Sequence, residues 1–109
     1  MHYSSLLLAA ALAVLAAPAM ADTPQFDLTI KNHRFEPATL VVPVETKFKL
    51  KISNLDPTPE EFESHELNRE KIIPGGQTAI VFIGPLNAGE YKYFGEFNED
   101  TAQGRIVAQ

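Results

Sequence analysis

One stretch decides the fold that the sequence predicts: Gly89-Glu90-Tyr91-Lys92-Tyr93-Phe94-Gly95-Glu96-Phe97-Asn98-Glu99-Asp100-Thr101-Ala102-Gln103-Gly104-Arg105-Ile106-Val107. Its aromatic first part predicts a strand over residues 90–94, and a second strand is expected to begin at Gly104. The polar loop between these strands carries three carboxylates, at Glu96, Glu99 and Asp100. Loops at one end of a rigid β-scaffold often carry the functional groups, so this loop is the first place to look for a site.

Short alternating segments precede this stretch and are separated by turn residues. Residues 26–31, 39–42, 46–53 and 77–83 are predicted strands, and the Pro74-Gly75-Gly76 run is a clear turn. In the strand over 46–53 the apolar residues alternate with Lys47, Lys49 and Lys51, which we expect on a solvated face. No segment after residue 21 shows the 3.6-residue period of a helix. We therefore predict an all-β Greek-key sandwich or barrel of seven or eight strands.

The N-terminal segment predicts export. Leu6 to Ala17 is an unbroken apolar run, followed by Pro18 and then by Ala19-Met20-Ala21, which has the pattern of a cleavage site. The run is shorter than the about 20 residues needed to span a bilayer. We expect a signal peptide over residues 1–21, cleaved after Ala21, and one exported domain over residues 22–109, with no membrane span in the mature chain.

Composition narrows the function classes. The net charge of −5 argues against nucleic acid and anionic membranes as partners, and favours cations or a basic protein surface. The chain has no cysteine, which excludes disulfides and thiolate metal sites. Templates for nucleophilic, phosphate-binding or zinc-protease catalysis are absent, so no enzyme class is assigned.

An acidic segment is the strongest candidate for chemistry. Residues 59–70 hold five glutamates and one histidine. If the segment is extended, Glu61, Glu63 and His65 share one face and, with a group from another loop, could hold a divalent ion. Glu96, between Gly95 and Phe97, is expected to be partly desolvated and to need a partner or a metal.

Structural alternatives exist for each of these residues. The acidic segment would equally suit a solvated edge strand that is protected from aggregation by its charges. Arg69 and Lys71 could pair with nearby glutamates across a turn. Glu96 could instead accept hydrogen bonds from loop amides.

Several motifs together resemble those of cupredoxin domains. They are Asn-x-x-Phe-x-Pro (Asn32, Phe35, Pro37), Leu-x-Val-Pro (Leu40, Val42, Pro43), Ile-Ser-Asn (52–54), Ile73-Pro74-Gly75, Gly-Glu-Tyr-x-Tyr (89–93) and Gly-x-Ile-Val (104–107). The acidic segment is similar to that of the EfeO-type subfamily, small exported proteins that accompany ferrous-iron permeases. The resemblance implies the cupredoxin topology, a periplasmic location, iron-uptake components as partners, and a metal site on Glu61, Glu63 and Glu96.

The resemblance also marks what is missing. It puts the cysteine of a type 1 copper site at Gly95, the loop histidine near Asn98 and the axial methionine near Gln103. It places His65 close to the first histidine, which makes His65 a better candidate ligand. We therefore expect an iron or copper ion bound without a type 1 site. The alternatives are a metal-free module that docks on a permease through its acidic strand, and a ferroxidase whose copper is bound elsewhere.

Overall fold

Apolar and polar residues that alternate along the sequence of a strand lie on opposite faces of that strand. The computed structural model describes residues 23–109; the expected signal segment and its cleavage site lie outside the described residues. In β4 (Phe48–Asn54) the side chains of Phe48, Leu50 and Ile52 are fully buried, whereas Lys49 and Lys51 on the other face are half-buried. The expected orientation of this strand is thus confirmed, because its apolar face has a core to pack against.

The first sheet has the strand order β2-β1-β4-β7. It is formed by β2 (Arg34–Glu36), β1 (Gln25–Lys31), β4 and β7 (Thr78–Ile83). Strand β1 runs parallel to β4, while the other two pairs are antiparallel. The short strand β2 is not among the strands predicted from the sequence.

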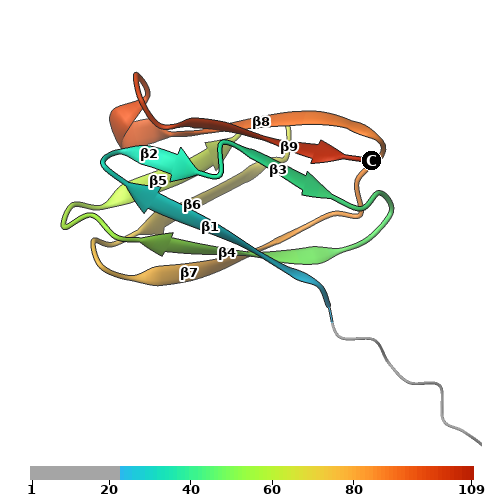
Figure 1. Ribbon diagram of the computed structural model, residues 1–109, viewed down its shortest axis with the longest axis horizontal. Coiled ribbons are helices and arrows are strands. Elements are labelled where there is room, and N and C mark those ends of the chain that lie inside the picture. The colour runs from blue at the N-terminus through green and yellow to red at the C-terminus, as the bar shows by residue number, and fades with distance from the viewer. Residues whose placement is uncertain (1–22) are drawn as a thin grey trace, which may run out of the picture.

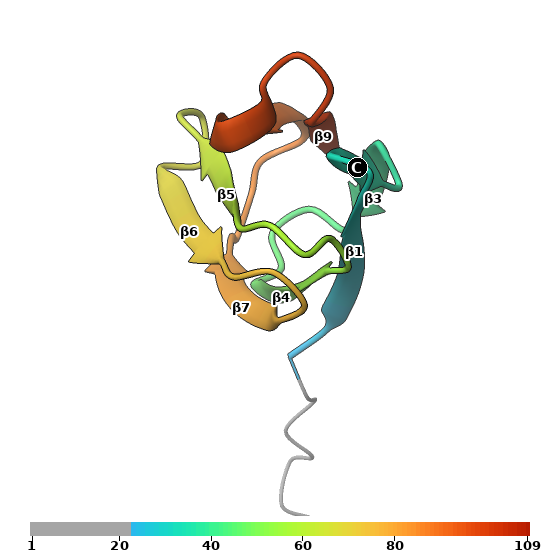
Figure 2. The same ribbon diagram turned by 90° about the vertical axis from the view of Figure 1, so that its left-hand side faces the viewer.

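The second sheet has the order β3-β9-β8-β5-β6. It contains β3 (Thr39–Val42), β9 (Gln103–Ala108), β8 (Gly89–Gly95), β5 (Glu60–Ser64) and β6 (Arg69–Ile73). A single 3-10 turn, η2 (Glu96–Asn98), lies in the connection from β8 to β9. Figure 1 shows that the two sheets face one another, and Figure 2 shows the ring of strands from one end.

An aromatic group fills one part of the core between the sheets. Phe35, Phe62 and Tyr93 are almost fully buried, and the ring of Tyr93 lies 5.0 Å from each of the other two. The Tyr93 ring also needs the space above Gly104, where an added Cβ would lie 2.4 Å from Cζ. The two tyrosines of β8 are therefore packing residues: Tyr93 is buried and Tyr91 packs against the edge of the core.

The loops at one end of the sandwich are joined by Asp56, which is 8 % exposed. Its carboxylate accepts hydrogen bonds from the backbone amides of Asn32 (2.8 Å) and His33 (2.9 Å). Both of these residues have left-handed backbones, with φ of 53° and 57°. Such a conformation is costly for residues other than glycine, so the carboxylate stabilises the turn between β1 and β2.

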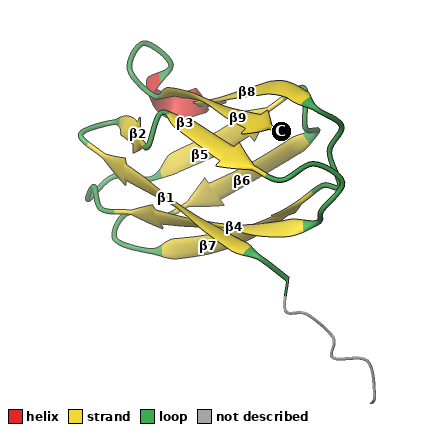
Figure 3. Cartoon of the chain, turned by 45° about the vertical axis from the view of Figure 1, so that its right-hand side comes forward, coloured by secondary structure: helices red, strands yellow, loops and turns green. Residues whose placement is uncertain are grey.

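The predicted fold class is confirmed. Residues 23–109 form nine strands in two sheets, rather than the seven or eight expected, and the one helical element described is the turn η2, drawn in red in Figure 3. The alternative of an acidic edge strand holds only in part: β5 pairs with β8 and β6 and is internal, whereas the exposed strand β6, which carries Glu70, is the edge of its sheet. The acidic residues therefore do not protect an open edge at β5.

Candidate metal-binding site

Strand β5 positions two of the predicted ligands. Because successive side chains alternate, Phe62 points into the core while Glu61 and Glu63 point to the outer face. Glu61 is half-buried, and Glu63 is 9 % exposed. Both glutamates were expected on one face, and both lie there.

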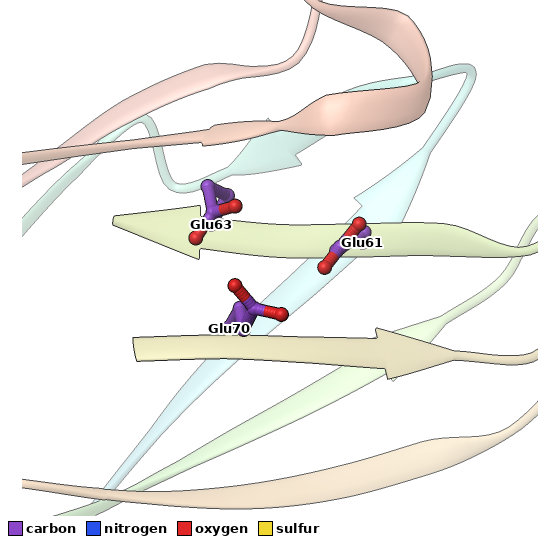
Figure 4. Close-up of side chains that lie close together, drawn as sticks. All are labelled: Glu61, Glu63 and Glu70. Atoms are coloured by element: carbon purple, nitrogen blue, oxygen red, sulfur yellow. The ribbon is translucent and has the colours of Figure 1, made fainter. Parts of the chain in front are cut away.

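Strand β6 adds a carboxylate that the sequence reasoning did not include. The antiparallel register places Glu70 directly opposite Glu63. One carboxylate oxygen from each of Glu61, Glu63 and Glu70 lies within 4.8 Å of the others (Figure 4). The sequence feature that could have indicated Glu70 is the β5–β6 hairpin. Once residues 65–68 are recognised as its turn, the register places Glu70 opposite Glu63.

The loop after β8 brings a fourth carboxylate. Glu96, in η2, has an exposed side chain, so its expected desolvation is not observed. Its negative charge nevertheless acts on Glu61 and Glu63 and contributes to raising the pKa of both. We call Glu61, Glu63, Glu70 and Glu96 the carboxylate cluster.

The surroundings of Glu61 and Glu63 disfavour the ionised forms of these two carboxyl groups. Burial is the main cause that raises the pKa of Glu61, followed by the negative charges of Glu96 and Glu70. Burial is also the main cause for Glu63, whose pKa is raised further by the neighbouring carboxyl groups of Glu96, Glu70 and Glu61. A bound cation would remove this repulsion.

Basic side chains do not neutralise the cluster. Arg69 donates instead to the backbone oxygens of Phe82, Leu67 and Asn68, and within residues 23–109 the single ion pair joins Arg105 to Glu90. The expected pairing of Arg69 or Lys71 with glutamates is therefore not found in this range, because the guanidinium group bridges β6 to β7.

The raised pKa values predict a pH dependence of stability. Glu61 and Glu63 bind protons more tightly when folded than when unfolded, so their contribution to the free energy of unfolding falls as pH rises above the ordinary value of 4.5. We expect the Glu61→Gln/Glu63→Gln variant to lose less stability than the wild type between about pH 4.5 and pH 7, in urea unfolding without metal. Parallel profiles for the two proteins would contradict this prediction.

His65 lies apart from the close group of carboxylates. Strand β5 ends at Ser64, so the alternation that would have placed His65 beside Glu63 stops one residue early. The imidazole is exposed and its ring centroid lies 5.6 Å from that of Phe94. His65 does line a surface cavity of about 210 Å³ together with Glu63 and Glu70, so it borders the cluster without joining it.

Glu60 has a role that the sequence reasoning missed. Its side chain is 1 % exposed and points inward, like that of Phe62. The alternation along β5 could have indicated this, because Glu60 stands two residues before a core phenylalanine. A buried Glu60 cannot contribute to an acidic docking edge.

The residues at the type 1 copper positions do not fit copper. Gly95 offers no ligand atom, and a Cβ there would lie 2.6 Å from Cδ of Glu60. The amide of Asn98 donates to Glu60, and the amide of Gln103 donates to the backbone oxygen of Glu99. The sequence lacks the type 1 ligands, and in addition the Glu60 carboxylate fills the space that a side chain at position 95 would need.

A comparison with known protein sequences finds a relative. The chain is 49 % identical over 80 residues to an uncharacterized protein of Rickettsia prowazekii (strain Madrid E); the match covers 73 % of this chain and 64 % of the relative. The chain thus spans a little under two thirds of that relative.

Solved structures share the fold at low identity. Auracyanin A, a blue copper protein from Chloroflexus aurantiacus, superposes with a TM-score of 0.69 at 13 % identity, covering 81 % of this chain and 100 % of that chain. The metal-binding domain of the Cu(I)-exporting P-type ATPase CopA of Streptococcus pneumoniae gives 0.67 at 10 % identity, with coverage of 84 % and 91 %.

The described residues hold no helix that is long and apolar enough to cross a membrane. The family model for the cupredoxin-like domain matches residues 4–108, nearly the whole chain. With two facing sheets in the described part and this match, the chain belongs to the cupredoxin-like domain family.

Proposed function

We propose that this domain binds one divalent cation, iron foremost, through the carboxylate cluster. The observation that carries the proposal is the convergence of carboxylate oxygens from Glu61, Glu63 and Glu70 within 4.8 Å of one another. Glu96, on a separate loop, adds a fourth carboxylate whose charge acts on Glu61 and Glu63. Groups of like charge held this close are stabilised by a cation between them.

The ligand chemistry favours a hard or borderline ion. Carboxylate oxygens suit ions such as Mn²⁺ and Fe²⁺, whereas Cu(I) prefers thiolates and thioethers. Two structural neighbours are copper proteins by name, but this chain has no cysteine and lacks the type 1 ligands. The fold is shared with them, while the proposed ion differs.

The biological setting is part of the same proposal. The apolar N-terminal run and the small-residue site ending at Ala21 support export to the periplasm. There the protein would accompany an EfeO-type iron uptake system and hand its ion to a permease.

The test is anaerobic calorimetric titration of the metal-free protein with Fe²⁺, Mn²⁺, Zn²⁺ and Cu²⁺ separately. We expect one ion per chain, with Fe²⁺ or Mn²⁺ bound more tightly than Cu²⁺ when both are compared in the same non-chelating buffer. Each of the four Glu→Gln changes in the cluster should weaken binding by about tenfold or more, equivalent to about 1.4 kcal/mol. His65→Ala should leave the affinity within about twofold if oxygens alone bind the ion.

The matched control is Glu99→Gln, which removes the same charge from an exposed position outside the cluster. It should leave the affinity unchanged. The proposal is overturned if no ion gives heat or thermal stabilisation, or if Glu99→Gln weakens binding as much as the cluster variants do. The first outcome would favour the alternative that the exposed glutamates dock a basic partner surface.

A further inference from the structure

A buried carboxylate connects the two parts of the chain that supply the cluster. Glu60 Oε1 accepts hydrogen bonds from the backbone amides of Glu61 (3.0 Å) and Phe97 (2.9 Å). Its Oε2 accepts a third bond from the side-chain amide of Asn98 (2.7 Å). Because all three contacts are donors, the buried carboxylate is well satisfied without a cation.

The two backbone amides that donate to Glu60 belong to the two segments that carry cluster residues, β5 and the loop after β8. One is the amide of Glu61, a cluster residue on β5; the other is the amide of Phe97, which directly follows the cluster residue Glu96. A single oxygen atom therefore joins the backbone of the strand to that of the loop. This contact lies between residues 37 positions apart in the sequence.

The turn η2 has no local anchor of the usual kind. Its N-cap is Gly95, which makes no side-chain capping bond, and none of its residues is buried. An N-cap side chain ordinarily accepts a bond from the second or third amide of the helical turn. Here Phe97 supplies the second amide, and Glu60 accepts that bond from another strand.

The fit around Glu60 leaves little freedom. A Cβ at Gly95 would lie 2.7 Å from Oε2 of Glu60, so only glycine allows the carboxylate to lie against β8. Side chains on β5 point alternately, so Glu60 faces inward while its neighbour Glu61 faces the cluster. The inner carboxylate thus holds the loop that carries Glu96 against β5, the strand that carries Glu61 and Glu63.

We propose that Glu60 is a positioning residue that sets the place of Glu96 in the carboxylate cluster by capping η2. It does not touch the ion and acts through the amides of Phe97 and Asn98. The consequence for metal affinity rests on the function proposed above. The consequence for the geometry of the loop does not depend on it.

The experiment uses three variants. Glu60→Ala removes the acceptor for Phe97 and Asn98, so the amide of Phe97 should exchange with deuterium at least about tenfold faster. Asn98→Asp should have a similar effect, because it sets one carboxylate against another. In Glu60→Gln/Asn98→Asp the glutamine oxygen accepts both backbone amides and its NH₂ group donates to the aspartate, so protection of Phe97 should return.

Metal affinity is the second readout. We expect Fe²⁺ binding to weaken about tenfold or more in Glu60→Ala and Asn98→Asp, and to recover in the paired variant. The control Leu28→Ala truncates a buried residue of β1, in the other sheet, and should lower stability without changing the affinity of the folded protein. A role of Glu60 in general stability alone would make Glu60→Ala behave like this control.

The outcomes separate the two proposals. If the wild-type protein binds no ion, the proposed function fails, while hydrogen exchange at Phe97 still decides the role of Glu60. If Phe97 stays protected and affinity is unchanged in folded Glu60→Ala, the positioning role is wrong. Should Glu60→Ala fail to fold, Asn98→Asp and its rescue decide the question, and absence of rescue overturns the inference.

Discussion

Replacing Gly95 with alanine is expected to destabilise the domain by about 3 kcal/mol, the upper part of the range for overpacked cores. The added Cβ would lie 2.6 Å from Cδ of Glu60 and 2.7 Å from Cβ of Ala102. Neither neighbour can withdraw at low cost: three hydrogen bonds hold Glu60, and the buried Ala102 accepts a backbone bond from Gly95 itself. Urea unfolding of the two proteins measures the difference.

Substitution of a second glycine, Gly76, serves as a control that distinguishes the cost of steric crowding from the cost of backbone strain. Gly76 has a positive φ of 74° and no neighbouring atom within 4 Å of an added Cβ, so Gly76→Ala should cost only the about 1–2 kcal/mol of a left-handed alanine. Combining Gly95→Ala with Glu60→Ala should cost less than the sum of the two single changes, because the clash and the carboxylate are removed together. A loss below 1 kcal/mol for Gly95→Ala would show that Glu60 is not held against β8.

Replacing Asp56 with alanine should produce a loss of similar size, about 3 kcal/mol, because two hydrogen bonds to a charged acceptor disappear. The amides of Asn32 and His33 would lose their acceptor while keeping the left-handed backbone that this acceptor supports. Asp56→Asn keeps one acceptor oxygen, so its stability should lie between the other two proteins. Equal stability of wild type and Asp56→Ala would contradict the assigned role.

The Asp56 variants should also differ in their response to acid. The hydrogen bond from His33 is the largest of the effects that hold the pKa of Asp56 below its ordinary value of 3.8, and it outweighs the effect of burial. A lowered pKa in the folded state contributes stability above about pH 3.8, which is lost as pH falls through the folded value. The stability difference between wild type and Asp56→Asn should therefore shrink in acid, in the direction opposite to the contribution of Glu61 and Glu63.

Alternation was enough to predict most of the sheet structure and part of the candidate site. The orientation of Lys49 and Lys51, and the shared face of Glu61 and Glu63, each follow from the period of two within one strand. Such predictions need no knowledge of neighbouring strands. They hold because a core on one side fixes which face of the strand is buried.

The expectations from sequence differ from the structure at positions where the pairing with another strand decides which side chains lie together. Glu70 joined the candidate site only through the register of β5 and β6, and His65 was left outside it because the strand ends at Ser64. The alternative considered for Glu96, a carboxylate that accepts loop amides, describes Glu60 instead. A single sequence contains the alternation that turns Glu60 inward, but it does not show that an amide 37 positions away will face it.

The place of β9 in its sheet has a consequence for the way this chain folds. Strand β9 lies between β3 and β8, and its parallel pairing with β3 joins Thr39 to Arg105, 66 positions apart. Until residues 103–108 have been synthesised, β3 lacks its neighbouring strand and one side of β8 stays open. Closing such long loops is slow, so we expect folding in the millisecond-to-second range, with open strand edges that can associate with other chains until β9 is inserted.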